Sequence, residues 1–139
     1  DGSFDPKYLD NLLKTCKQNF DIVFASRYIK NGGSDDDTIL TKFLNFIFTK
    51  IGNIFFSLNI TDILFTYVLG KTRSFNDLKL QSNDFTLCVE FPIKANRNNY
   101  KLDTISSFER NRIGGKKKVN AFKDGLLILL KMIKMFFVR

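Results

Sequence analysis

An amphipathic helix followed directly by a short apolar strand limits the folds open to this chain. Between Pro6 and about Asn19 the apolar side chains recur at the spacing that one buried helix face requires. They are Tyr8, Leu9, Leu12, Leu13 and Cys16. Asp5 is a typical N-cap, and Pro6 suits the first helical position. The run DIVFASRY at 21–28 is short, apolar and partly β-branched, which predicts a buried strand. This order predicts an α/β fold built on a sheet.

The rest of the chain continues this alternation. Residues 29–38, IKNGGSDDDT, predict an exposed loop that caps a long apolar helix over 39–58. A further helix over 83–99 carries Pro92 inside its pattern, which predicts a kink or an early end there. Residues 100–108 predict a second short strand, and a terminal helix begins at about Asn120. At 139 residues, without a linker or a repeat, we expect one domain.

Composition restricts the chemistry further. Lys and Arg outnumber Asp and Glu by 22 to 14, and the net charge of +8 favours anionic partners such as phosphates, nucleic acid or an acidic membrane. The sequence has no histidine, and Cys16 and Cys88 lack CxxC spacing, which excludes a Cys/His zinc site. We expect both cysteines to be buried thiols of a reducing compartment.

The terminal helix combines apolar and basic residues. No uninterrupted run of about 18 apolar residues is present, and the nearest, 126–137, is broken by Lys131 and Lys134. Between Phe122 and Val138 the pattern is that of a basic amphipathic helix. Such a helix either lies in a membrane interface or packs on the sheet.

Three clusters are candidates for chemistry, and each also has a purely structural interpretation. Asp1-Gly2-Ser3 is a polar turn. Asp62 lies among apolar residues, where an ionised carboxylate needs a partner, and like Glu90 it is more often structural than catalytic. The basic loop over 110–118 contains two glycines ahead of a helix, so its cations either bind phosphate or are simply solvated. Because no nucleic-acid-binding motif accompanies these cations, we favour phosphate over nucleic acid.

Taken in order, five stretches resemble one family. They are DGSFDP at 1–6, DIVFASRYIKNGGSDDDT at 21–38, TDILFTYVLGKT at 61–72, DFTLCVEFPIKA at 84–95 and SSFERNRIGGKKKVNAFKDG at 106–125. Together they resemble the second half of a family 2 glycosyltransferase, and the nearest subgroup is similar to dolichol- and polyprenyl-phosphate sugar synthases. The resemblance implies a GT-A fold, a Rossmann-like α/β sheet that binds a nucleotide-sugar and Mg²⁺ or Mn²⁺. It also implies that residues 1–139 are the C-terminal part of one catalytic domain, without its N-terminal nucleotide-binding half.

The resemblance also assigns roles on the donor and acceptor sides. Asp1 matches the second aspartate of the family's Asp-x-Asp motif and would bind the metal, and Gly2 and Ser3 complete this donor-site turn. The metal neutralises the charge that builds on the leaving phosphate. Asp62 and Glu90 would be catalytic, lining the acceptor side where a carboxylate orients or deprotonates the attacking group.

The resemblance also assigns the contacts with the substrate phosphates to basic residues. Arg112 and Lys118 match the family's Arg-x-x-Gly-x-x-Lys element, which lies over the phosphates, and Arg110 and Lys117 would assist. Lys117 stands where these synthases usually carry serine. By the same resemblance Arg27, in Ser-Arg-Tyr, would also point toward the phosphates, although an arginine at the end of a strand can equally cap a helix or form a salt bridge.

These roles predict a metal-assisted, inverting glycosyltransferase, cytoplasmic and peripheral at the inner face of the cell membrane. It would move a sugar from a nucleotide-sugar donor to a polyprenyl or dolichyl phosphate, and it would have no nucleic-acid partner. We expect the 139-residue piece itself to be inactive, since the donor half is missing. Two alternatives stay open: a saccharide acceptor in cell-envelope glycan synthesis, and a non-enzymatic basic module that binds nucleic acid or acidic membrane through residues 110–118.

Overall fold

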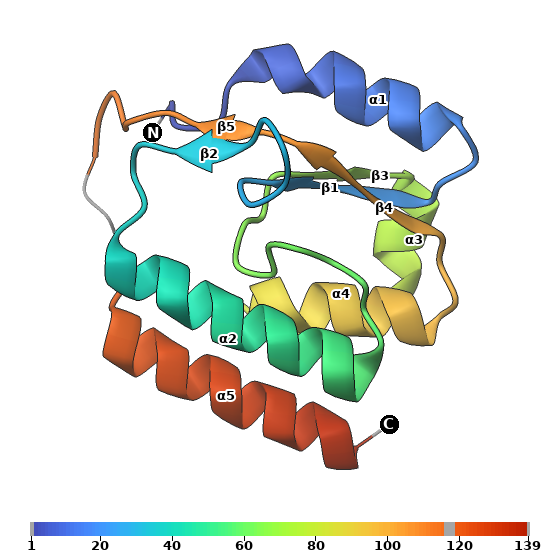
Figure 1. Cartoon of the computed structure of the whole chain (residues 1–139). Coiled ribbons are helices and arrows are strands. Elements are labelled where there is room, and N and C mark those ends of the chain that lie inside the picture. The colour runs from blue at the N-terminus through green and yellow to red at the C-terminus, as the bar shows by residue number, and fades with distance from the viewer. Residues whose placement is uncertain (1, 116–118, 139) are drawn as a thin grey trace.

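The computed structural model describes residues 2–115 and 119–138 and is a mixed α/β structure, as the sequence predicts (Figure 1). A 3₁₀ turn over Pro6–Tyr8 precedes the first α-helix. The elements are α1 Leu9–Lys17, β1 Ile22–Ser26, β2 Gly33–Ser34, α2 Ile39–Phe56, β3 Val68–Gly70, α3 Thr72–Asp77, α4 Leu87–Arg97, β4 Leu102–Ser106, β5 Phe108–Glu109 and α5 Ala121–Phe137.

Two small sheets organise the fold. The larger has the strand order β3-β1-β4, in which β1 is parallel to β4 and antiparallel to β3. Ser26 at the end of β1 lies opposite Ser106 at the end of β4. The smaller sheet pairs β2 with β5 in parallel and places Ser34 opposite Glu109. Both predicted strands are therefore confirmed, and the chain leaves both of them at the same edge of the sheet.

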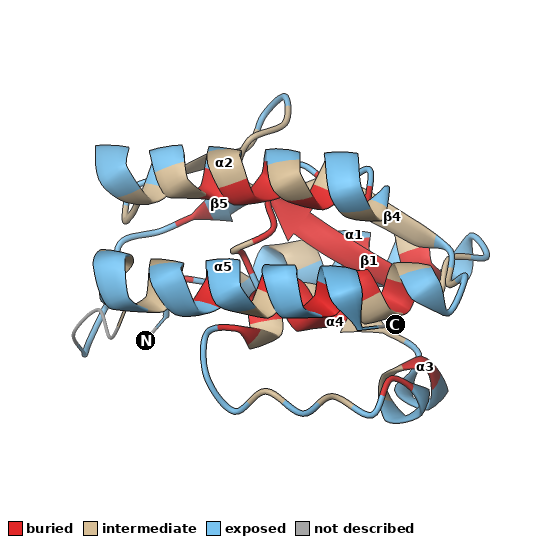
Figure 2. Cartoon of the chain, turned by 90° about the horizontal axis from the view of Figure 1, so that it is seen from below, coloured by how far each residue is buried: buried red, intermediate tan, exposed pale blue. Residues whose placement is uncertain are grey.

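Helices cover both faces of the larger sheet. Figure 1 shows α1 above the strands and α2, α4 and α5 below them. Val23 and Ala25 of β1 pack in the core on the α1 side, whereas Ile22 and Phe24 pack in the core formed with α2, α4 and α5. Seen from below, α2 and α5 run side by side with their buried residues turned inward (Figure 2). Because both faces are covered, all five residues of β1 are buried.

The predicted helices are confirmed, with differences at their ends. The Asp5 carboxylate accepts a hydrogen bond from the Lys7 backbone N–H, so the predicted cap serves the 3₁₀ turn before α1. The helix ends before Asn19, which adopts a left-handed φ of 78°. The predicted early end at Pro92 is wrong, because α4 continues to Arg97 with Pro92 buried inside it.

The two cysteines are buried free thiols, as predicted. Burial raises the pKa of the Cys88 thiol to about 12, which makes it a poor nucleophile at neutral pH. By length and composition, α2 is the one helix among residues 2–115 and 119–138 that could cross a membrane, although 22% of it is buried inside the fold. The sequence pattern predicts that this helix is either deeply buried or packed against an apolar surface.

Candidate functional site

A cleft with a volume of about 770 Å³ gathers polar residues from distant parts of the chain. It lies where β1 and β5 end and where α2 and α4 begin, so it occupies the common exit edge of the strands. Its walls include Ser3, Arg27, Asp36, Asp37, Asp84, Glu109, Arg112, Gly114 and Gly115. Three residues predicted for the site, Ser3, Arg27 and Arg112, therefore line one cleft.

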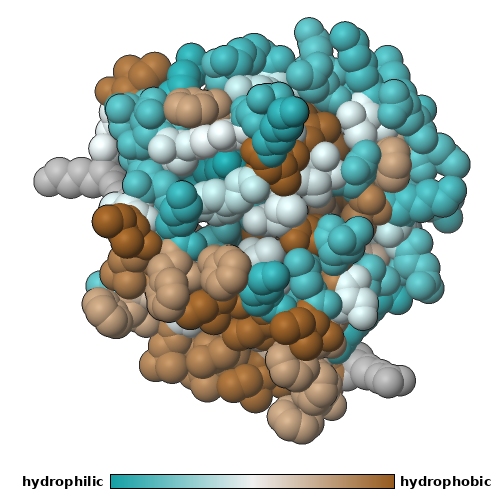
Figure 3. Space-filling model, viewed as in Figure 1, coloured by the Kyte–Doolittle hydropathy of each residue, from teal (hydrophilic) through white to brown (hydrophobic). Residues whose placement is uncertain are grey.

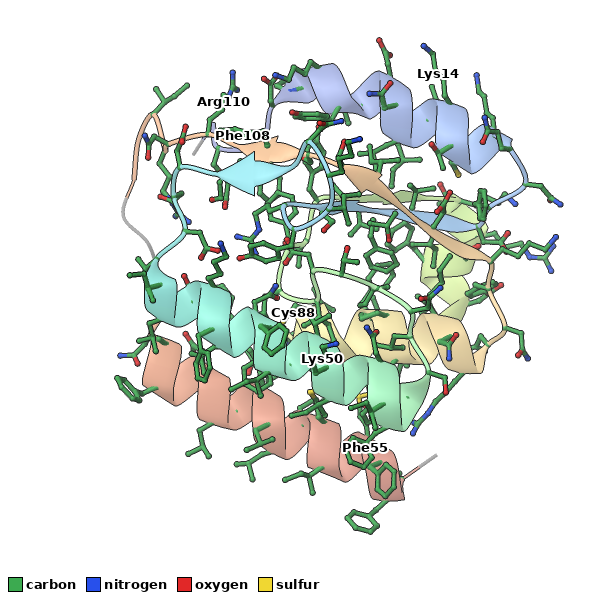
Figure 4. All side chains as sticks on the ribbon, viewed as in Figure 1. Lys14, Lys50, Phe55, Cys88, Phe108 and Arg110 are labelled. Carbon is green, nitrogen blue, oxygen red and sulfur yellow. The ribbon has the colours of Figure 1, made fainter. Side chains whose placement is uncertain are left out.

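The N-terminal turn and the basic loop form one wall. The Arg110 backbone N–H donates to the Ser3 carbonyl at 3.0 Å, and the Arg110 guanidinium donates to the Gly2 carbonyl at 3.2 Å. Phe4 forms an antiparallel bridge with Glu109. Gly2 has a φ of +79°, and a side chain there would meet Ile113. Figure 4 shows Phe108 and Arg110 beside β5; Gly2 and Arg110, both predicted for the site, do not line the cleft themselves. The predicted donor turn and the predicted phosphate loop are thus neighbours.

Arg27 lies at the back of the cleft in a buried ion-pair network. Its Nε and Nη2 donate to the two carboxylate oxygens of Asp62 at 2.7 and 2.9 Å, and its Nη1 donates to Glu109 at 2.9 Å. The guanidinium also lies 4.6 Å from the centroid of the Phe65 ring. Burial opposes the charge of Arg27, but the hydrogen bonds and charge of Asp62 outweigh burial and raise its pKa above the ordinary value. Arg27 therefore stays protonated and is held rigidly.

Asp62 lies behind Arg27 rather than on the cleft wall. Its side chain is fully buried, and it also accepts a hydrogen bond from the Arg27 backbone N–H at 3.1 Å. Burial raises the pKa of Asp62, and Arg27 opposes that shift. In this arrangement Asp62 orients Arg27. Its assignment as a catalytic residue stays a prediction.

Glu109 is a cleft residue that the sequence did not single out. It accepts hydrogen bonds from Arg27 and, at 2.6 Å, from the Ser34 hydroxyl, and so it joins the end of β1 to β2. The signal in the sequence is only that an acid stands between Phe108 and Arg110 in the resembling stretch. Its partners are more than 70 residues away along the chain, and no local pattern identifies them.

Arg112 lines the cleft beside the acidic loop. Its Nε donates to Asp36 at 3.1 Å, and its side chain is 22% exposed. The neighbouring Asp37 accepts hydrogen bonds from the hydroxyls of Tyr28 and Thr41. The run Asp35–Asp37, predicted as an exposed cap, thus supplies ionic partners to the cleft, while Thr38 caps α2. Lys117 and Lys118, predicted to bind phosphate, lie outside the described residues.

Glu90 is held at a different place, between α4, α5 and the loop before α4. Its carboxylate accepts backbone hydrogen bonds from Gln81 at 3.0 Å and Ser82 at 2.8 Å. Lys94 lies at 2.7 Å and Lys131 at 3.1 Å. Burial would raise the pKa of Glu90, but these four donors together lower it to about 2. Glu90 is therefore ionised at neutral pH, and its catalytic role also stays a prediction.

The predicted metal site has limited support in the described residues. Asp1, its one predicted ligand, lies outside them. Among residues 2–115 and 119–138, no three acidic or cysteine side chains come together in a way that could hold a metal ion. The cleft acids instead accept hydrogen bonds from Arg112, Tyr28, Thr86 and Arg27. We therefore assign no step to the metal.

The described lining of the cleft carries two cations, Arg27 and Arg112, and four acids, Asp36, Asp37, Asp84 and Glu109. Arg112 is partly exposed on its wall, and Gly114 and Gly115, which have open space where a side chain would be, let a ligand approach the backbone. Arg27 lies at the back of the cleft, where Asp62 and Glu109 balance its charge. No protein-family model matches this sequence.

Proposed function

We propose that this chain is part of the catalytic domain of an inverting, GT-A-type family 2 glycosyltransferase. Its substrates would be a nucleotide-sugar and a polyprenyl or dolichyl phosphate. The observation that carries the proposal is the cleft itself, which joins Ser3, Arg27 and Arg112 from three separate stretches that resemble this family. The metal enters the proposal through the resemblance alone.

The lining of the cleft supports an amphiphilic acceptor. Besides its four acids, the cleft is lined by Arg112 and Arg27 and by the apolar residues Leu64, Leu87, Val119 and Ile128. A phosphate attached to a hydrocarbon chain needs both surfaces, because the phosphate requires cations and the chain requires an apolar wall. A sugar acceptor would need mainly hydrogen-bonding groups, and the lining also offers these, for example from Thr66, Asn83 and Asp84, so the saccharide alternative stays open.

The partners of the two predicted catalytic acids favour the lipid phosphate. Asp62 contacts Arg27 with both oxygens, and Glu90 has two lysines and two backbone amides. Neither acid lines the cleft. A phosphate oxygen is already anionic and attacks without a base, whereas a sugar hydroxyl needs one. In the proposed reaction this oxygen forms a bond to the sugar C1 while the bond from C1 to the nucleoside diphosphate breaks.

Arg112 is the residue to test first. In the protein expressed from its complete coding sequence, Arg112→Ala should lower the rate of sugar transfer to a polyprenyl phosphate about 100-fold, because a phosphate-stabilising donor is lost. Transfer would be followed with radiolabelled nucleotide-sugars in the presence of Mg²⁺ or Mn²⁺. Lys14→Ala is the matched control, since Lys14 is exposed on α1, away from the cleft (Figure 4). A rate for Arg112→Ala equal to that of the control would contradict the phosphate role.

The non-enzymatic alternative predicts a different result. A basic module would bind oligonucleotides with an affinity that falls steeply with salt and does not depend on metal. Arg110 and Arg112, two cations of the loop, are already close to Asp5 and Asp36, which leaves less charge for such binding. Salt-dependent oligonucleotide binding without sugar transfer would favour this module over the transferase.

A further inference from the structure

The outward faces of α2 and α5 form one continuous apolar surface, which we call the α2–α5 face. Figure 3 shows it as the hydrophobic lower part of the molecule. Several side chains are almost fully exposed, with Ile39 at 91%, Phe122 at 82% and Phe137 at 79%. The other exposed members are Phe43, Phe46, Ile54, Phe55, Leu126, Leu129, Leu130, Ile133 and Phe136. Exposed apolar patches of this kind mark interaction sites in soluble proteins.

Helical spacing places these side chains on one side of each helix. In α5, Ile128, Met132 and Met135 are buried, and the exposed residues fall on the opposite side. The sequence offered interface or core as alternatives for this helix. Its buried side packs in the core, so only its outward side is available for a partner.

The two helices meet through apolar residues near both ends of the pair. A side chain at Gly125 of α5 would contact Leu44 and Phe48 of α2. Near the other end of the pair, the Phe55 and Phe136 rings lie 5.7 Å apart, and Figure 4 shows Phe55 at this end. The apolar surface therefore crosses the seam between α2 and α5.

Lysines border the face on both long sides. With about 3.6 residues per turn, Lys42 falls on the side of α2 turned away from α5, and Lys50 lies beside Phe46 within the face. Lys123 and Lys134 fall on the side of α5 turned away from α2. Neither helix offers an exposed acid, because α2 contains none and the single acid of α5, Asp124, is half-buried and accepts the Asn120 backbone N–H.

Polar contacts fasten α2 to the fold along its length. Asn45 accepts a hydrogen bond from the Leu64 backbone N–H at 2.9 Å, and Thr49 accepts one from that of Ile63 at 3.2 Å. Asn53 exchanges two hydrogen bonds with the backbone of Ile60. A helix that crossed the bilayer would lose these partners. α2 is therefore suited to lie along a surface, although its length and composition would allow it to span.

We propose that the α2–α5 face docks on the surface of an anionic lipid bilayer, with its phenylalanine and aliphatic side chains below the headgroups. The lysines on its two borders would contact anionic headgroups, since their long side chains can reach the polar layer. A second copy of the chain fits less well. A twofold dimer through this face would bring these lysines together with no exposed acid of α2 or α5 to pair with them.

Vesicle sedimentation tests this proposal without reference to sugar transfer. The protein should bind vesicles of phosphatidylcholine and phosphatidylglycerol about tenfold more tightly than vesicles of phosphatidylcholine alone, because several lysines contact the anionic headgroups. The combined substitution Phe43→Gln, Phe122→Gln and Leu126→Gln should weaken binding more than about tenfold, as apolar area is lost. Leu9→Gln with Leu13→Gln is the matched control, because these exposed leucines lie on α1 at the opposite side. Circular dichroism checks that each variant folds.

The outcomes separate the possible occupants. Loss of vesicle binding in the α2–α5 variant, with unchanged binding in the α1 variant, supports the proposal. Equal binding by both variants overturns it. The proposal is also overturned if the wild-type protein does not bind vesicles. If that protein forms a dimer in sedimentation equilibrium and the α2–α5 variant does not, the face binds a second copy of the chain instead. Failure of sugar transfer would leave these measurements unaffected, so the two proposals fail independently.

Discussion

Asp62 and Glu90 are both buried carboxylates predicted to be catalytic, yet their surroundings give them opposite properties. Asp62 is held by one arginine directly behind the cleft, and burial raises its pKa. Glu90 has two lysines and two backbone amides away from the cleft wall, and its pKa falls to about 2. Burial acts to raise the pKa of both acids; the four donors around Glu90 outweigh it, whereas the three hydrogen bonds from Arg27 to Asp62 do not.

The largest expected effect comes from removing Arg27. Arg27→Met should lower the free energy of unfolding by about 3–5 kcal/mol, because Asp62 and Glu109 would be left buried without their common cation. Chemical denaturation would measure the change. Arg73→Met is the control, since Arg73 is 93% exposed and its pair with Asp77 is on the surface. Similar losses of unfolding free energy in both variants would show that the buried network contributes no more than a surface ion pair.

Glu90→Gln should have a smaller effect, about 2–3 kcal/mol on the same scale. Glutamine can still accept from a backbone amide, and Lys94 and Lys131 are partly exposed, so water can solvate them once the charge is lost. Denaturation of this variant beside Arg27→Met tests the ranking. A larger loss of unfolding free energy in Glu90→Gln than in Arg27→Met would contradict the ranking. It would mean that water does not compensate Lys94 and Lys131 for the lost carboxylate.

The smallest expected effect is the pH dependence of the free energy that Glu90 contributes to folding. Because folding lowers the pKa of Glu90, its ionised form stabilises the fold above the ordinary value of 4.5. That contribution is lost as the pH falls from 4.5 toward about 2. The difference in unfolding free energy between wild type and Glu90→Gln should therefore shrink over this range. A constant difference at every pH would contradict the lowered pKa.

The sequence predicted those helices and strands that are long enough to show a regular spacing of apolar residues. The patterns of 21–28 and 100–108 located β1 and β4, and the long helices followed from their apolar spacing. β3 and α3 were missed, because three and six residues are too few to show a period. β2 and β5 have two residues each and exist because they pair with each other across the fold.

The candidate site was predictable only in part. The resemblance selected Ser3, Arg27 and Arg112, which do line one cleft. It gave no reason to pair Arg112 with Asp36, since charge patterns in sequence do not state which ions meet. Glu109 escaped notice for the same reason. Ion pairs between distant segments depend on the final packing, whereas helices and strands depend largely on their neighbours in the chain.

The pairing of Ser3 with Arg110 has a consequence for the order of folding. The turn at Gly2 and Ser3 is synthesised more than 100 residues before its partner Arg110. α1 can pack on β1 much earlier, since they adjoin in sequence. Contacts between distant segments form slowly. The cleft can therefore form only after β5 has been synthesised. A chain interrupted before β5 would contain the three strands of the larger sheet, but it would lack Glu109, which together with Asp62 holds Arg27.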